Sequence, residues 1–256
     1  MYLREIHAEK HIPTLYQFIK ENPLGLLITA IDSKTTPFLQ SSHIPWVLDI
    51  PDDKNEKNLG TLRGHIARAN PQAKAFVETA KGALESEINP DGSYSLKRDV
   101  LVIFNGPAHH YVTPKFYTET KPATGKVVPT WNYSAVQAYG RATVFYDTKA
   151  ESTHTFLDKQ IRDLTNHNEV DIMGHKEKPW VVEDAPEPYI KVLKSAILGI
   201  QIEISDIGGK WKMSQEMPAG DQEGVANGFE SLNTELGTEM AKTVRSRCMK
   251  KEENDS

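Results

Sequence analysis

Residues 24–48, LGLLITAIDSKTTPFLQSSHIPWVL, determine the fold that we expect for this chain. Residues 24–31 form a short apolar run with branched side chains, which is typical of a buried strand. A polar turn follows, and residues 38–48 predict a second strand, so the two strands form a hairpin. Pro45 interrupts the second strand because proline lacks the backbone donor, and we expect an edge or a bulge there.

Helical and extended patterns follow one another on both sides of this hairpin. Asn70 and Pro71 form a good N-cap and first helical position, and they predict a helix over residues 71–84. Further helices are predicted at 11–22, 148–167, 188–194 and 218–236, and strands at 59–69, 99–105, 109–113, 127–147, 196–207 and 210–214, with Gly208 and Gly209 as a turn.

Helices do not alternate regularly with strands, which is unfavourable for a doubly wound parallel sheet. The pattern predicts an α+β fold built around an antiparallel barrel with peripheral helices. We expect one domain over residues 1–240, followed by a flexible charged tail over 241–256.

Composition excludes several classes of protein. The chain has 256 residues, of which 38% are hydrophobic and 25% charged, so it can bury a core without a disulfide or a metal. A net charge of -5 argues against a surface that binds nucleic acid throughout. Cys248 alone cannot form an internal disulfide, which suits a reducing compartment. Without a signal-peptide pattern or a long apolar run, we expect a cytoplasmic protein that does not bind membranes.

Common catalytic and phosphate-binding motifs are missing. The chain has no GxGxxG, GxxxxGK[ST], HExxH, CxxC or GxSxG pattern. His109 and His110 are neighbours on a predicted strand and therefore point to opposite faces, so we expect no metal site there.

Two polar segments occupy positions where core strands would be apolar. In the first, Ser41 and His43 share one strand face, and Ser42 shares the other with Ile44. A solvated outer face would carry the same residues.

In the second segment, residues 62–71, Arg63 and His65 share a strand face, and Gly64 permits close approach of the backbone. Arg68 and Asn70 precede a helix N-terminus, which favours an anion. A surface arginine paired with a carboxylate is the alternative.

Two later segments add an aromatic and a basic element. Trp131 and Tyr133 flank Asn132, an arrangement that offers stacking and both hydrogen-bond polarities to a planar heterocycle, although core packing explains it equally well. In residues 208–215, alternation places Lys210, Lys212 and Ser214 on one face, next to Gln215. This face suits an anion, or else protects an exposed edge strand.

Taken in order, these segments resemble the PaiB-type family of FMN-binding negative transcriptional regulators. The matching motifs are SHIP, LRGHIARANPQ, VLVIFNGPAHHYVTPKFY, KVVPTWNYSAVQAYG and GKWKMSQ, and they extend over nearly the whole chain. The resemblance implies a flavin-reductase-like split β-barrel that forms a homodimer, with FMN at the subunit interface.

The resemblance also implies which residues bind FMN. Ser41, Ser42, His43 and Ile44 would line the isoalloxazine or ribityl side. Arg63, His65, Arg68 and Asn70 would make the polar and phosphate contacts. Trp131 and Asn132 would come from the other wall or the partner subunit, and Lys210, Lys212, Ser214 and Gln215 would complete the site.

Three functions remain open at this point. The first is a flavin-dependent oxidoreductase-like protein that acts on a small molecule and whose flavin performs the electron chemistry. The second is a negative transcriptional regulator or binding module without turnover. Its DNA contacts could come from basic residues. However, acidic residues follow the basic residues of the tail, and no helix-turn-helix is visible, so direct DNA binding is doubtful. The basic residues are Arg141, Lys149, Lys191, Lys194, Arg245, Arg247, Lys250 and Lys251.

The third function is haem binding, since some split barrels hold haem in place of flavin. His7, His43 or His65 could then serve as the axial ligand.

Overall fold

The computed structural model describes residues 1–51 and 58–255 of the chain. The side chains of Lys250 and Lys251 are not among the described ones. The described residues form two compact units. Unit 1 comprises Met1–Leu15, Asn105–Val136 and Gly208–Ser256, and unit 2 comprises Tyr16–Phe104 and Gln137–Ile207. The single domain expected over residues 1–240 stays a prediction.

Unit 2 contains the antiparallel sheet that the sequence predicted. Its strands are β2 (Leu24–Ala30), β3 (Leu39–Pro45), β4 (Val47–Asp49), β5 (Thr61–Ala67), β6 (Tyr94–Ser95) and β7 (Val100–Asn105), together with the inner parts of β9 (Thr130–Phe145) and β10 (Ile197–Lys212). The order of neighbours is β3-β2-β7-β9-β10-β5-β4.

The break at Pro45 turns this open order into a barrel. β3 pairs with β2 along its whole length, whereas β4, only one residue further on, pairs with β5 at the other end of the order. The two ends of the sheet are therefore consecutive pieces of chain, and the sheet closes around a core. Trp46, the residue between the pieces, is 1% exposed. The expected interruption at Pro45 is confirmed, and so is the α+β class with an antiparallel barrel.

Gly64 of β5 makes room for the tryptophan at this corner. A Cβ atom at residue 64 would lie 2.9 Å from Ile44 Cγ2 and from two atoms of the Trp46 ring. Only glycine allows the β5 backbone to approach the ring so closely. The groups that approach the backbone at Gly64 are therefore core side chains.

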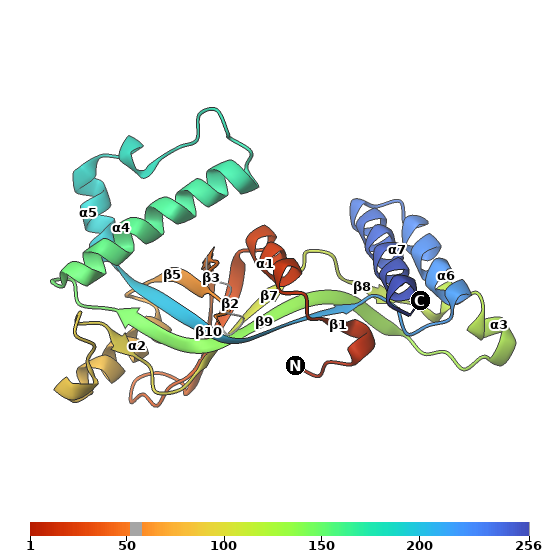
Figure 1. Cartoon of the computed structure of the whole chain (residues 1–256), viewed down its shortest axis with the longest axis horizontal. Coiled ribbons are helices and arrows are strands. Elements are labelled where there is room, and N and C mark those ends of the chain that lie inside the picture. Colours follow the sequence, from red (N-terminus) through yellow and green to blue (C-terminus); the bar gives the residue numbers. More distant parts are fainter. Residues whose placement is uncertain (52–57, 256) are drawn as a thin grey trace. The chain divides into compact units, whose positions relative to one another are not determined.

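Helices pack around the sheet of unit 2. Figure 1 shows α4 (Glu151–Asn166) and α5 (Glu187–Ser195) on one side of it and α2 (Pro71–Lys81) on the other. Asn70 caps α2 as predicted, because its Oδ1 accepts the Gln72 N–H at 2.8 Å and Pro71 is the first helical residue. α1 (Ile12–Glu21) also follows the predicted range.

Unit 1 combines short strands with a helical pair. β1 (Ala8–Glu9) pairs with the end of β10, and β8 (His110–Val112) pairs with the start of β9. α6 (Ala219–Glu230) and α7 (Glu235–Asp255) pack through Val225, Phe229, Met240 and Val244, which are all buried. Asp221 of α6 accepts the backbone N–H groups of Glu119 and Thr120, which lie at the start of α3 (Thr120–Thr124).

One expectation about the C-terminal part is wrong. Gly208 and Gly209 do not form a turn, because β10 continues through them as one strand of 16 residues. Residues 241–255 of the expected tail lie in α7, and their flexibility stays a prediction. None of the helices in the described ranges combines the length and the apolar character needed to cross a bilayer.

Candidate functional site

The polar face predicted on β3 exists in unit 2. Ser41 and His43 are exposed, Ser42 is half-buried, and Ile44 is 1% exposed. The side chain of Ile44 therefore belongs to the barrel core and cannot line an open site. The remaining three side chains present two hydroxyls and an imidazole along a strand at the end of the sheet order.

Arg63 lies in unit 2, and its contacts stabilise the fold. Its guanidinium group is buried and donates to Asp49 through Nε and Nη2, to Asp163 Oδ2 at 2.6 Å and to Gln160 Oε1 at 3.3 Å. Burial acts to lower the pKa of Arg63, but the bonds to Asp49 and Asp163 outweigh it and raise the pKa. Because β4 supplies one carboxylate and α4 the other, four of the five N–H donors of Arg63 already have partners within the fold.

His65 and Arg68 differ from Arg63, because each has a buried nitrogen without a partner in the part of the chain that the structure describes. These atoms are His65 Nδ1 and Arg68 Nε. Burial lowers the pKa of His65, which favours the neutral imidazole. Burial also lowers the pKa of Arg68, against the attraction of Asp147. Arg68 Nη2 donates to the Tyr146 carbonyl at 2.7 Å.

Asn70 connects β3 to the N-terminus of α2. While its Oδ1 caps the helix, its Nδ2 donates to Ser42 Oγ at 3.0 Å. Ser42, Asn70 and the first turn of α2 thus form one polar cluster. A helix N-terminus carries a positive partial charge and free N–H groups, so this cluster can hold an anion.

A cavity of about 390 Å³ also lies in unit 2, between Arg68 and the helices α4 and α5. Lys191 and Lys194 of α5 were predicted only as part of a DNA surface, and His154 and Asp158 were not among the predicted site residues. The backbone pairing brings them to Arg68, since the Arg68 N–H donates to the Ala196 carbonyl directly after α5. No local pattern in the sequence could predict this long-range contact.

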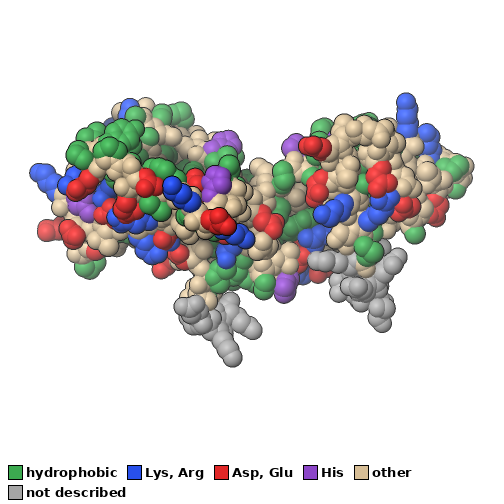
Figure 2. Space-filling view, turned by 90° about the horizontal axis from the view of Figure 1, so that it is seen from above, with side chains coloured by type: hydrophobic (Ala, Val, Ile, Leu, Met, Phe, Trp, Pro, Cys, Tyr) green, Lys and Arg blue, Asp and Glu red, His purple; other side chains and the backbone are tan. Residues whose placement is uncertain are grey.

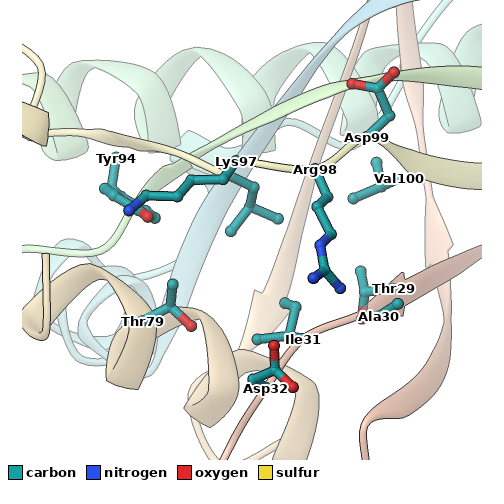
Figure 3. Close-up of a pocket in the computed structure, with 11 residues that line it drawn as sticks. Thr29, Ala30, Ile31, Asp32, Thr79, Tyr94, Lys97, Arg98, Asp99 and Val100 are labelled. Atoms are coloured by element: carbon teal, nitrogen blue, oxygen red, sulfur yellow. The ribbon is translucent and has the colours of Figure 1, made fainter.

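A second cavity in unit 2, of about 200 Å³, lies between α2 and the ends of β2 and β7 (Figure 3). The Arg98 side chain extends across it toward Thr29 and Asp32 in Figure 3, and Lys97 extends toward Tyr94. None of the predicted site residues lines this cavity.

Unit 1 holds the remaining predicted site residues. Trp131 is 55% exposed and lies edge-on to Tyr111 at 6.2 Å between ring centroids. Asn132 and Ser214 are buried and bonded to each other, with Asn132 Nδ2 3.1 Å from Ser214 Oγ. Gln215 is buried as well, and it bonds to the Met213 N–H and the Trp211 carbonyl. Ser214 follows the end of β10 and has φ +65°, so the expected alternation stops at Lys212.

The two lysines of β10 are also engaged. Lys210 donates to the Tyr2 carbonyl at 3.0 Å and lies over the Tyr2 and Tyr133 rings. Lys212 donates to Thr130 Oγ1 at 2.6 Å and to the Trp131 carbonyl at 3.0 Å.

Glu216 lies beside this basic pair. Its Oε1 is 3.8 Å from Lys212 Nζ, and its Oε2 is 2.9 Å from His7 Nε2. Burial lowers the pKa of Lys212. Burial alone would raise the pKa of Glu216, but the contacts with His7 and Lys212 lower it. His7, one of the three candidate haem ligands, therefore already has a partner.

The structure sorts the predicted residues into two groups by unit. Ser41, Ser42, His43, Ile44, Arg63, His65, Arg68 and Asn70 lie in unit 2, while Trp131, Asn132, Lys210, Lys212, Ser214 and Gln215 lie in unit 1. Within unit 2, Ser42 and Asn70 are in direct contact. The expectation that the unit 1 residues contact the same cofactor stays a prediction.

The closed antiparallel barrel and its polar strand face define a split-barrel protein. The chain belongs to the family described as "Putative FMN-binding domain", whose model matches residues 1–206. The resemblance to the PaiB type is confirmed. The chain is 26% identical over 251 residues to the protease synthase and sporulation protein PAI 2 of Bacillus subtilis, covering 98% of this chain and 99% of that protein.

An uncharacterized protein of Aspergillus fumigatus is more similar, at 59% identity over 256 residues, with 96% of this chain and 97% of that protein covered. Among solved structures, the flavocytochrome Anf3 of Azotobacter vinelandii matches with a TM-score of 0.42 and 12% identity, covering 82% of this chain and 72% of that one.

Proposed function

We propose that the protein binds FMN in unit 2, through the polar cluster and through His65 and Arg68, and is a flavin-dependent, oxidoreductase-like protein that acts on a small molecule. The observation that carries this proposal is that two buried nitrogens, His65 Nδ1 and Arg68 Nε, have no partner among the described residues. Burying a polar group without a hydrogen bond is costly, so both atoms are available to a ligand.

The donor set of this region suits FMN. Ser42 and the α2 N-terminus offer a hydroxyl and backbone N–H groups, and Arg68, which lines the α4–α5 cavity, offers a cation; each of these groups suits a phosphate. Burial lowers the pKa of His65, which favours the neutral imidazole, so His65 can exchange a hydrogen bond with the uncharged part of the flavin. Ser41 and His43 are exposed and accessible to the ribityl chain. When bound, FMN supplies the transfer of a hydride or of electrons, and the protein orients it.

A homodimer belongs to this proposal. Trp131 is a large aromatic side chain that is more than half exposed, and its ring face is available for stacking against a planar heterocycle. We propose that it reaches the flavin bound to a partner subunit. Asn132, Ser214 and Gln215 are buried and satisfied by one another or by backbone groups, so we assign them to supporting the Trp131 strand.

A titration tests the proposal. FMN is added to the purified protein while flavin absorbance and fluorescence are followed, and the size of the complex is measured by gel filtration. We expect binding to a dimer and bleaching of the bound flavin by NADH or NADPH. Arg68→Ala should weaken FMN by about 1.5–3 kcal/mol if its guanidinium contacts the phosphate.

The control is Lys176→Ala, which removes an exposed cation of the same unit. An FMN affinity that both variants leave unchanged would place the phosphate elsewhere. A bound flavin that neither NADH nor NADPH bleaches would exclude these two donors for the proposed electron chemistry.

A further inference from the structure

The α4–α5 cavity of unit 2 has the size and lining of a ligand site. Its volume of about 390 Å³ lies within the range of small-molecule pockets. Buried Leu157 forms an apolar part of its wall, and three hydroxyl groups and an imidazole supply hydrogen bonds. The polar residues of the lining are Arg68, Thr148, Thr153, His154, Asp158, Lys191, Lys194 and Ser195.

The charge of the lining is predominantly positive. Arg68, Lys191 and Lys194 contribute three cations, and Asp158 is the one carboxylate among the described lining residues. Lys194 is largely buried and pairs with Asp158 at 2.5 Å. Lys191 pairs with Glu187 on the exposed side of α5. Figure 2 looks down on this α4–α5 layer, where basic, acidic and hydrophobic side chains lie close together.

Arg68 is the cation of the lining that has no ion pair. In the described ranges no carboxylate lies within ion-pair distance of it, although Asp147 attracts it, and its guanidinium group donates to the neutral Tyr146 carbonyl. A partly buried cation without an ion-pair partner is costly for the folded protein. An anion that enters the cavity would remove this cost.

The start of α4 adds a second source of positive potential. Thr148 precedes the helix, and Thr153 and His154 lie in its first turn. Ala150 stands at the N-cap and provides no side-chain acceptor. The helix N-terminus therefore lies at the cavity without a side-chain cap, and Glu151 is the acidic residue of its first turn.

We propose that this cavity binds the phosphate group of a phosphomonoester. A tetrahedral dianion matches a lining of an arginine, two lysines and three hydroxyls, since charge-assisted bonds to phosphate are among the strongest in proteins. The phosphate can belong to FMN itself or to a second small molecule. In the first case, the inference rests on the proposed function and extends the flavin site to α4 and α5.

Phosphate binding without flavin provides the direct test. Inorganic phosphate is titrated into the flavin-free protein and followed by calorimetry and by ³¹P NMR. Lys194→Gln should weaken phosphate at least about 10-fold, as expected for the loss of one charge-assisted bond. Asp158→Asn should strengthen phosphate binding several-fold, because it removes the competing carboxylate and frees Lys194. Lys176→Ala is the matched control and should change nothing.

The source of the phosphate is resolved by comparing FMN with riboflavin, which lacks the phosphate. If FMN supplies it, phosphate competes with FMN, and Lys194→Gln weakens FMN but not riboflavin. If another molecule supplies it, phosphate and FMN bind together without competition. Both results support the inference.

The failure of this inference is distinct from failure of the proposed function. Phosphate binding with no flavin binding would retain the cavity site and reject the FMN proposal. A wild-type protein that binds FMN but does not bind phosphate, with FMN affinity unchanged in Lys194→Gln, would overturn the cavity site alone. A phosphate affinity equal in wild type, Lys194→Gln and Asp158→Asn would also overturn it.

Discussion

Arg63 in β5 and Arg68 directly after β5 show how the same residue type serves two purposes five positions apart. Arg63 is enclosed by Asp49, Asp163 and Gln160, and all of these contacts come from the neighbouring strand or from α4. Arg68 has a single carbonyl partner and faces a cavity. The first arginine therefore stabilises the barrel, and the second is available to a ligand.

Arg63→Met should destabilise the protein strongly. The substitution leaves Asp49 and Asp163 without their buried cation, and removing one partner of a buried pair costs about 3–5 kcal/mol. Since both carboxylates are partly exposed, the lower end of this range applies. Urea unfolding measures the loss, with Lys159→Ala as the control. Lys159 is an exposed partner of Asp163, and its removal should cost less than about 1 kcal/mol. Equal losses in both variants would contradict a structural role for Arg63.

The same cluster predicts a dependence of stability on pH. Burial alone would raise the pKa of Asp163, but its bonds to Lys159 and Arg63 lower it. A carboxylate whose folded pKa is below its unfolded value of about 4 contributes stability that is complete above that value. The contribution disappears as the pH falls through the folded pKa. Wild type should therefore lose more stability than Arg63→Met when the pH is lowered from 5 to about 2, as measured by urea midpoints.

At the scale of elements, adjacent glycines in β10 offer a matched comparison. A Cβ atom at Gly209 would collide with Leu15 Cδ2 and the Trp211 ring, whereas one at Gly208 would meet nothing within 4 Å. Gly209→Ala should cost about 1–3 kcal/mol through overpacking, and Gly208→Ala should be close to neutral. Thermal unfolding of the two variants tests this. A destabilisation by Gly208→Ala as large as that by Gly209→Ala would contradict the continuous strand.

Substitutions of Asn70, the N-cap of α2, distinguish an effect on the stability of the protein from an effect on FMN binding. Asn70→Ala removes the acceptor for the Gln72 N–H and should cost about 1 kcal/mol. Asn70→Asp retains the acceptor, so stability should stay close to that of wild type. It also introduces a negative charge beside the proposed phosphate, so FMN should bind more weakly. Unfolding curves and FMN titrations of both variants test these expectations. If Asn70→Asp bound FMN as tightly as wild type, this result would contradict the proposed site.

Sequence patterns predicted those features of the fold that depend on residues close together in the chain. The Asn70 cap, the Pro45 interruption and the faces of β3 follow from local backbone chemistry, and all three are present. The prediction of a turn at Gly208 and Gly209 was wrong because the backbone stays extended through both residues, and Gly209 permits close packing against Leu15 and Trp211. The partners of Arg63 lie 14 and 100 residues away, and no local pattern could separate it from Arg68.

At the scale of the whole molecule, two compact units divide the predicted site residues. The barrel of unit 2 holds the buried polar atoms that lack a partner among the described residues, and unit 1 holds predicted site residues that are mostly bonded to one another or to the backbone. The motifs that carry the family resemblance lie in both units. The family was therefore predictable from the order of motifs along the chain, whereas the division of roles between the motifs required the hydrogen bonds.

The most direct test of the central claim is an FMN titration of the wild-type protein and of Arg68→Ala, followed by flavin absorbance and fluorescence. The account predicts saturable binding by the wild type and a loss of affinity of at least about 10-fold in the variant, which corresponds to one charge-assisted bond. A folded wild-type protein that leaves the flavin spectrum unchanged, or a variant that binds FMN as tightly as wild type, would contradict it.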